Sequence, residues 1–207
     1  MLAESGFIAS YLTSHFAGRA SQPSTATLVP RKWQPGKEGQ PGGETAAWLR
    51  HEYLLHYNEG SLFPLIVTKL ILDLFSSDRI PFFVRPISGL VARKVIGAYI
   101  FPNARRHLAF LEGMLDDVPR DGDHHGSEAR DASPRFLCGG ELTAADILMS
   151  FALLTAKSRF ADAGAWKGGI EAEFPKVWAY LDRLEDQEGY KQSVKKIEEL
   201  EGKSGAK

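Results

Sequence analysis

Two histidines with acidic neighbours are the first residues in this sequence whose types suggest metal binding. His124 and His125 follow Asp121 and Asp123 in a polar, glycine-containing stretch. Imidazole and carboxylate groups are common ligands of divalent metals. However, neighbouring residues in such a stretch are more often solvent-exposed than joined to one ion. We therefore expect no metal site here.

Cys138 is the only cysteine, which excludes a disulfide framework and any zinc site built from several cysteines. It lies between Leu137 and Gly139 at an apolar turn, and no adjacent basic residue would lower its pKa. We expect a small buried hydrophobic residue rather than a nucleophile. A chain without paired cysteines fits a reducing compartment, so we predict a cytoplasmic protein.

The segment around Thr143 and Asp146 carries the clearest local signal. Thr143 precedes an apolar periodic stretch and Asp146 follows three residues later, which is the spacing of a capping box. In that motif the Thr143 hydroxyl accepts from the Asp146 N–H, and the carboxylate accepts from the Thr143 N–H. The pair predicts a well-formed helix start with a structural role.

Composition and charge place the chain among globular proteins. Of its 207 residues 43% are hydrophobic and 25% charged, and 25 basic residues face 26 acidic ones. This balance argues against a general nucleic-acid binder, which would carry a basic surplus. The N-terminus lacks the pattern of a signal peptide. The longest apolar stretch, 61–75, is too short to span a bilayer and contains Lys69 and Asp73, so we predict no transmembrane segment.

Apolar residues along the chain recur at helical spacing, and no stretch shows the alternating pattern of a strand. Pro64 and Pro102 fall inside two long helical stretches, where each predicts a kink. Residues 18–43 are predicted to form a loop or linker because proline and glycine recur in them. Residues 119–135 are predicted to form a second loop because they are polar and show no apolar periodicity. The sequence predicts an all-α protein with helices over 5–16, 45–75, 87–117, 143–160, 174–184 and 190–200.

Several blocks, in order, resemble the cytosolic glutathione transferases of fungal and bacterial type. The blocks are LAESGFIASYL, EYLLHYNEGSLFPLIV, PNARRHLAFLEGML, FLCGGELTAADILMSFAL and EFPKVWAYLDRLEDQEGYKQSV, and together they cover most of residues 2–197. The resemblance implies a C-terminal helical bundle preceded by the last helix of a thioredoxin-like domain. It divides the chain into a thioredoxin-like remnant at 1–17, a linker at 18–43, the all-helical domain at 44–200 and a frayed tail at 201–207.

The resemblance assigns glutathione binding to Glu4 and Ser5, which match the acidic residue and serine that hold the γ-glutamyl end in this family. A helix N-terminus has unpaired N–H groups and a partial positive charge, both suited to a carboxylate. Glu4 suits the α-ammonium group. A simpler explanation is that Ser5 only caps the helix.

The family's electrophile would lie against the first long helix, where Tyr53, His56, Tyr57 and Phe63 are candidates for an apolar pocket. Aromatic residues at this spacing could equally form core or a dimer interface. No residue matches the family's catalytic hydroxyl or thiol, which precedes the serine turn in the family pattern. We therefore assign no catalytic residue, and we expect either that the sequence is truncated at its N-terminus or that the protein has a shortened N-terminal domain and altered activity.

Two functions follow from this resemblance. The first is a glutathione transferase that conjugates glutathione, as co-substrate, to apolar electrophiles through a bound thiolate, acting in detoxification as a homodimer and needing no cofactor. The second is a non-catalytic, transferase-like module for interaction or ligand binding. Phe7, Ile8 and Tyr11 give the first helix an apolar face with no sheet to cover it, so we also expect weak stability or self-association.

Overall fold

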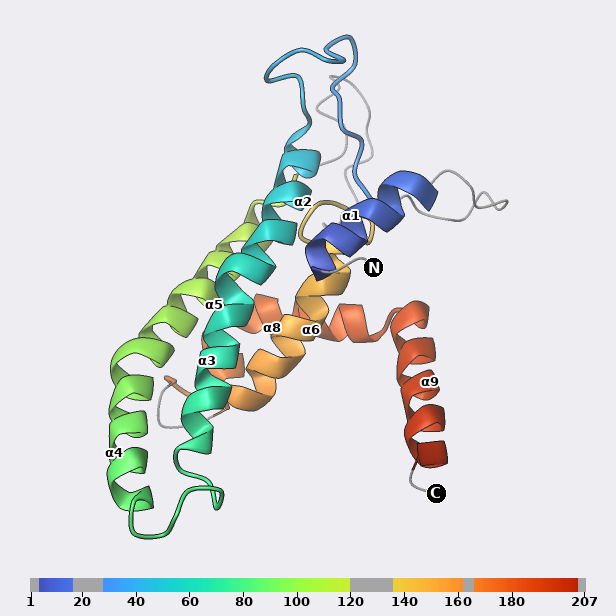
Figure 1. Cartoon of the computed structure of the whole chain (residues 1–207). Coiled ribbons are helices and arrows are strands. Elements are labelled where there is room, and N and C mark those ends of the chain that lie inside the picture. The colour runs from blue at the N-terminus through green and yellow to red at the C-terminus, as the bar shows by residue number, and fades with distance from the viewer. Residues whose placement is uncertain (1–3, 17–27, 120–135, 162–165, 205–207) are drawn as a thin grey trace.

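The computed structural model describes residues 4–16, 28–119, 136–161 and 166–204. These residues form helices joined by loops, with isolated β-bridges and no named strand among them, which confirms the all-α class (Figure 1). In the described part of the chain, no helix is long and apolar enough to cross a membrane. The elements are α1 (Ser5–Phe16), α2 (Ala46–Tyr57), η1 (Asn58–Leu62), α3 (Phe63–Leu74), α4 (Arg85–Val95), η2 (Ile96–Ile100), α5 (Phe101–Asp116), α6 (Ala144–Arg159), α7 (Ile170–Glu173), α8 (Pro175–Glu185) and α9 (Glu188–Ser204).

Each of the two long predicted helices contains a π-helical turn where a kink was expected. The turn η1 ends two residues before Pro64, and η2 ends two residues before Pro102. Proline has no N–H and its ring crowds the carbonyl four residues earlier, so an α-helical turn cannot close there. A wider turn leaves room for the ring and lets the helix continue. The second long helix begins at Arg85, two residues before the predicted start.

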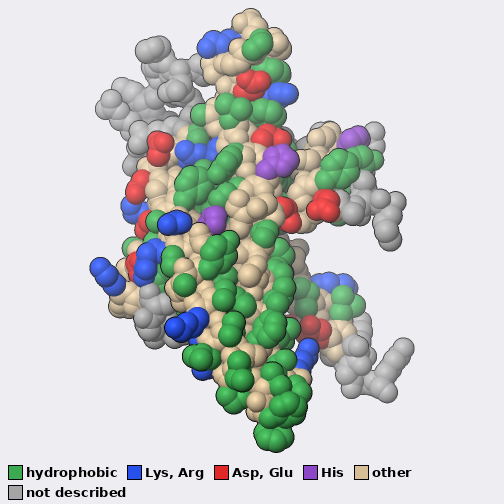
Figure 2. Space-filling view, turned by 60° about the vertical axis from the view of Figure 1, so that its left-hand side comes forward, with side chains coloured by type: hydrophobic (Ala, Val, Ile, Leu, Met, Phe, Trp, Pro, Cys, Tyr) green, Lys and Arg blue, Asp and Glu red, His purple; other side chains and the backbone are tan. Residues whose placement is uncertain are grey.

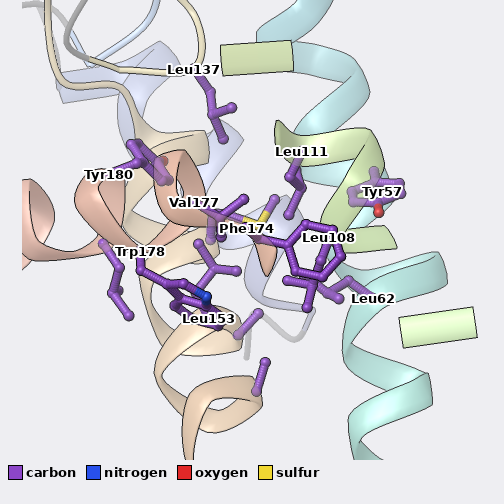
Figure 3. Packing of buried hydrophobic residues seen from close by; sticks show 14 of the residues in the cluster. Tyr57, Leu62, Leu108, Leu111, Leu137, Leu153, Phe174, Val177, Trp178 and Tyr180 are labelled. Carbon is purple, nitrogen blue, oxygen red and sulfur yellow. The ribbon is translucent and has the colours of Figure 1, made fainter. Parts of the chain in front are cut away.

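Helix α6 forms the centre of the bundle and contacts α1, α2, α3 and α8. Its buried side chains Ala145, Met149, Ala152, Leu153 and Ala156 recur at helical spacing and make one apolar face. Figure 3 shows this core, where side chains of α6 meet those of α5, α8 and η1. Alanines on α6 let neighbouring helices approach closely, which explains how one helix can contact four others.

The described part of the predicted linker, residues 28–43, is a folded loop. Trp33 pairs with Glu44 in an antiparallel bridge, and the Gln34 N–H donates to the Gly43 carbonyl at 2.8 Å. Lys32 lies over the rings of Trp33 and Trp48, at 4.8 and 4.6 Å from their centroids. The loop is thereby tied to the first turn of α2. Residues 18–27 and 120–135 lie outside the described residues, as do His124, His125, Asp121 and Asp123.

The C-terminal region differs from its prediction in two ways. The last helix, α9, extends to Ser204, so residues 201–204 are helical rather than part of a frayed tail. The charged side chains of α9 from Glu188 to Glu201 are exposed, so solvent hydrates them on the helix surface. The single turn α7 was not predicted because four residues are too few to show a helical period.

A tertiary contact caps α8. The helix starts after Phe174, which has no side-chain acceptor, and the N–H groups of Lys176 and Val177 donate instead to the Glu112 carboxylate of α5 at 3.0 and 2.9 Å. A carboxylate at a helix N-terminus accepts hydrogen bonds from the free N–H groups and is attracted by the positive end of the helix dipole.

We expect Glu112→Ala to lower the free energy of unfolding by about 1.5 kcal/mol, because two N–H groups lose their acceptor. Urea denaturation followed by circular dichroism would measure the change. Glu198→Ala, an exposed site on α9, is the control. Equal stability of the two variants would contradict the capping role.

Candidate functional site

The start of α1 places Glu4 and Ser5 against the π-turn η1. The Glu4 carbonyl accepts the Ile8 N–H at 2.9 Å, so Glu4 rather than Ser5 occupies the N-cap position. Glu4 has a φ of 68°, a conformation that residues with a side chain rarely adopt outside functional or tightly constrained turns. The Ser5 hydroxyl donates to Glu59 Oε1 at 2.5 Å. The simpler explanation, Ser5 as the helix cap, is therefore wrong.

The residues of η1 complete the polar half of this site. Glu59 Oε1 also accepts from Asn58 Nδ2 at 3.3 Å. Asn58 is 3% exposed, and its Oδ1 has no hydrogen-bond partner among the described residues. Helix α1 approaches η1 closely at Gly6, where an added Cβ would lie 3.4 Å from the Leu55 carbonyl oxygen and 3.8 Å from Glu59 Cγ. The free N–H groups at the start of α1, the Glu59 carboxylate and a buried amide thus lie together.

This arrangement suits a ligand that carries both charges of an amino acid. The first N–H groups of α1 have no intrahelical partners, and the helix dipole favours a carboxylate there. The carboxylate of Glu59 favours an ammonium group beside it. The Ser5 hydroxyl lies between these two regions, since it belongs to the first turn of α1 and already contacts Glu59.

The four candidate pocket residues do not form one cluster. Phe63 packs on Phe151 of α6 with ring centroids 5.6 Å apart, and Phe151 is 61% exposed. Phe63 and Glu59 lie one turn apart on the same helix, so this apolar pair adjoins the polar site. His56 is exposed and makes no ring contact or hydrogen bond with the other three candidates within the described ranges.

Tyr53 and Tyr57 instead stack on each other and pack against α5. Their centroids are 5.7 Å apart, and Phe110 lies 6.0 Å from Tyr53 and 5.3 Å from Tyr57. The Tyr57 hydroxyl is 2.6 Å from His107 Nδ1. Burial raises the pKa of Tyr57 and lowers the pKa of His107, so both are neutral at pH 7 and the hydroxyl can donate to the ring nitrogen. These residues are consistent with the core or interface interpretation of the aromatic pattern.

The capping box at α6 is present and is part of a larger buried group. Asp146 Oδ2 accepts the Thr143 N–H at 2.8 Å and the Thr143 hydroxyl at 2.6 Å. Its Oδ1 accepts the Leu137 N–H at 3.1 Å and the Tyr180 hydroxyl at 2.6 Å. Burial raises the pKa of Asp146, and these hydrogen bonds oppose that shift. With 0% exposure the carboxylate has no route to a substrate, so its role is structural, as predicted.

Cys138 is buried, as its apolar neighbours predict, and lies in the turn closed by the bridge between Phe136 and Gly139. Burial raises its thiol pKa to about 12, so almost no thiolate exists at neutral pH. Within the described ranges, no group of three or more His, Cys, Asp or Glu side chains could hold a metal ion.

Sequence reasoning missed Glu59, Asn58 and Phe151 as site residues. Glu59 and Asn58 had a usable signal, because Gly60 and Pro64 mark a helix irregularity and π-turns are frequent at functional sites. Phe151 had none, since an exposed aromatic residue on a core helix cannot be told from a buried one by periodicity. Its contact with Phe63 depends on how α3 and α6 pack.

Comparison with known proteins gives two matches. Residues 91–183, from α4 to α8, match the family model described as the glutathione S-transferase C-terminal domain. The chain is 27% identical over 200 residues to Glutathione S-transferase 1 of Saccharomyces cerevisiae, an alignment that covers 97% of this chain and 68% of the yeast protein. No solved structure matches the chain significantly.

Proposed function

We propose that this chain, which is similar to the glutathione S-transferases over residues 91–183 and to a yeast member over most of its length, is a protein of that family that binds glutathione at the start of α1 and transfers it to apolar electrophiles. The observation that carries the proposal is the contact between Ser5 and Glu59, which brings the α1 N-terminus and a second carboxylate together. The γ-glutamyl group of glutathione has a carboxylate and an ammonium group on one carbon. These charges match the helix N–H groups on one side and Glu59 on the other, and the family resemblance adds Glu4 as a second partner of the ammonium group.

We expect the electrophile to lie beside that site, and the contact of Phe63 with Phe151 supports this expectation because it supplies apolar surface there. The glutathione sulfur would attack an electrophilic carbon as the thiolate, forming a carbon–sulfur bond while a leaving group such as halide departs with its electron pair. We assign no residue of this chain to thiolate activation. Its own residues supply binding and orientation, which raise the rate by holding both reactants together.

Homodimerisation, a cytoplasmic location and a role in detoxification are parts of the same proposal. Leu49, Tyr53 and Phe110 expose 52%, 49% and 40% of their surface on α2 and α5, an apolar face that a second copy could cover. Light scattering during gel filtration would separate a monomer of 22.9 kDa from a dimer.

We expect Glu59→Gln to weaken glutathione binding about tenfold, because a charge-assisted hydrogen bond to the ammonium group becomes a neutral one. Isothermal titration calorimetry of the full chain would measure this change. Glu198→Gln, an exposed glutamate on α9, is the matched control and should bind like the unaltered chain.

A ligand analogue sharpens the experiment. Glutathione without its α-amino group should bind the unaltered chain and Glu59→Gln equally, because it lacks the ammonium donor whose hydrogen bond Glu59 would accept. An equal loss for both ligands would show that Glu59 acts only on structure. Absence of glutathione binding to the unaltered chain would overturn the proposed function, whereas binding without conjugation of an aryl halide would favour the non-catalytic module.

A further inference from the structure

The turn between α3 and α4 carries the most exposed apolar side chains of the described chain. Phe82 is 81% and Phe83 69% exposed, and their rings meet edge to face at 5.6 Å. Burying two such rings in the bundle would be favourable, yet the fold leaves both in solvent. We use the name apolar end for the exposed hydrophobic side chains of residues 71–95, which are Ile71, Leu74, Phe75, Phe82, Phe83, Val84, Ile87, Leu90, Val91 and Val95.

The apolar end continues along α4. Ile87, Leu90 and Val91 are 68%, 53% and 58% exposed and follow the spacing of one helix face. Lys94 falls on the same face one turn later, and it too is exposed. Figure 2 shows hydrophobic side chains covering the lower end of the molecule, with Lys and Arg side chains at the margins of this surface.

The charge of this region differs in sign from that of the remaining chain. Residues 69–95 contain five basic and two acidic residues, whereas the rest of the sequence has 20 basic and 24 acidic residues. Both acidic side chains form ion pairs within the region: Asp73 with Lys69 at 2.6 Å and Asp78 with Arg85 at 2.8 Å. Arg79, Arg93 and Lys94 have no ion pair with any described residue, so the surplus charge is available to a partner.

We propose that the apolar end binds the surface of a negatively charged lipid bilayer. The phenylalanines at the turn and the exposed face of α4 would enter the boundary between headgroups and acyl chains, a depth of about 5–10 Å that suits one helix face. Arg79, Arg93 and Lys94 would contact anionic headgroups, because their long side chains can extend from the apolar face toward the headgroup layer.

A second copy of the chain fits this surface less well. In a two-fold symmetric dimer the same patch faces itself, so the unpaired basic residues of one copy would approach those of the other. An anionic bilayer instead provides both an apolar layer and the opposite charge. The exposed face on α2 and α5 described above remains open to a second copy while the apolar end is bound.

Vesicle co-sedimentation of the full chain tests the proposal, using pure phosphatidylcholine vesicles and vesicles with 30% phosphatidylserine, about the anionic share that gives a biological surface potential. We expect preferential binding to the anionic vesicles, weakened by high salt because screening shortens the range of the charges. Phe82→Ser with Phe83→Ser should lower the partition coefficient about tenfold or more, since two buried aromatic side chains lose their apolar burial. Arg93→Gln with Lys94→Gln should lower it about fivefold per charge.

Ile197→Ser with Leu200→Ser is the matched control, because these residues are 53% and 55% exposed on α9, far from the apolar end in Figure 1. All variants alter exposed side chains, and circular dichroism would check that they remain folded. Absence of binding to anionic vesicles overturns the proposal, as does an equal loss in the control. A dimer that dissociates when Phe82 and Phe83 are replaced would identify the apolar end as a protein interface instead.

Discussion

Replacing Asp146 by alanine is expected to lower the free energy of unfolding by about 4 kcal/mol, enough to remove much of the stability of a typical domain. The carboxylate is fully buried and accepts hydrogen bonds from Thr143, Leu137 and Tyr180. Alanine would leave two backbone N–H groups, the Thr143 hydroxyl and the Tyr180 phenol without this acceptor. Urea unfolding followed by circular dichroism would measure the loss.

Two further variants separate the hydrogen bonds from the change in volume. Asp146→Asn keeps the shape and one acceptor oxygen, so we expect it to cost about 2 kcal/mol. Asp182→Ala removes an exposed carboxylate of α8 and should change stability by less than about 0.5 kcal/mol. A cost for Asp146→Ala no larger than that of Asp182→Ala would contradict the structural role of this carboxylate.

The second large effect is expected at Phe160, where alanine should cost about 3–5 kcal/mol. Phe160 is 0% exposed at the end of α6 and packs edge to face on Phe101 with centroids 6.4 Å apart. Its carbonyl accepts Trp166 Nε1 at 2.5 Å, so the ring lies where three segments join. Truncation leaves a cavity that helices on both sides cannot close.

Phe151 offers a matched control on the same helix. It is 61% exposed, so Phe151→Ala creates no cavity and should change the unfolding free energy by less than about 1 kcal/mol. Because Phe151 adjoins the proposed electrophile site, the same variant should instead weaken binding of an apolar glutathione conjugate. Equal losses of stability at Phe151 and Phe160 would contradict the burial that the structure gives them.

Most helices of the fold could be predicted from local patterns in the sequence, α7 excepted. Apolar residues at helical spacing predicted that residues 5–16 are helical, and the capping box located the start of α6 at Thr143. Pro64 and Pro102 correctly marked where the long helices depart from α-helical geometry. All of these depend on interactions within about four residues, which a single sequence displays directly. The proposed division into a thioredoxin-like remnant, linker and helical domain stays a prediction.

Which of these helices share a site depends on how they pack and could not be predicted from local patterns. Ser5 and Glu59 are 54 positions apart, and their contact depends on α1 packing beside η1. The aromatic residues of the first long helix separate for the same reason, since Tyr57 faces α5 while Phe63 faces α6. Local periodicity gives each side chain a direction around its own helix, but the neighbour it meets depends on how the whole bundle packs. The fold class could therefore be predicted from the sequence. The long-range partners of Ser5, Asp146 and Phe63 could not.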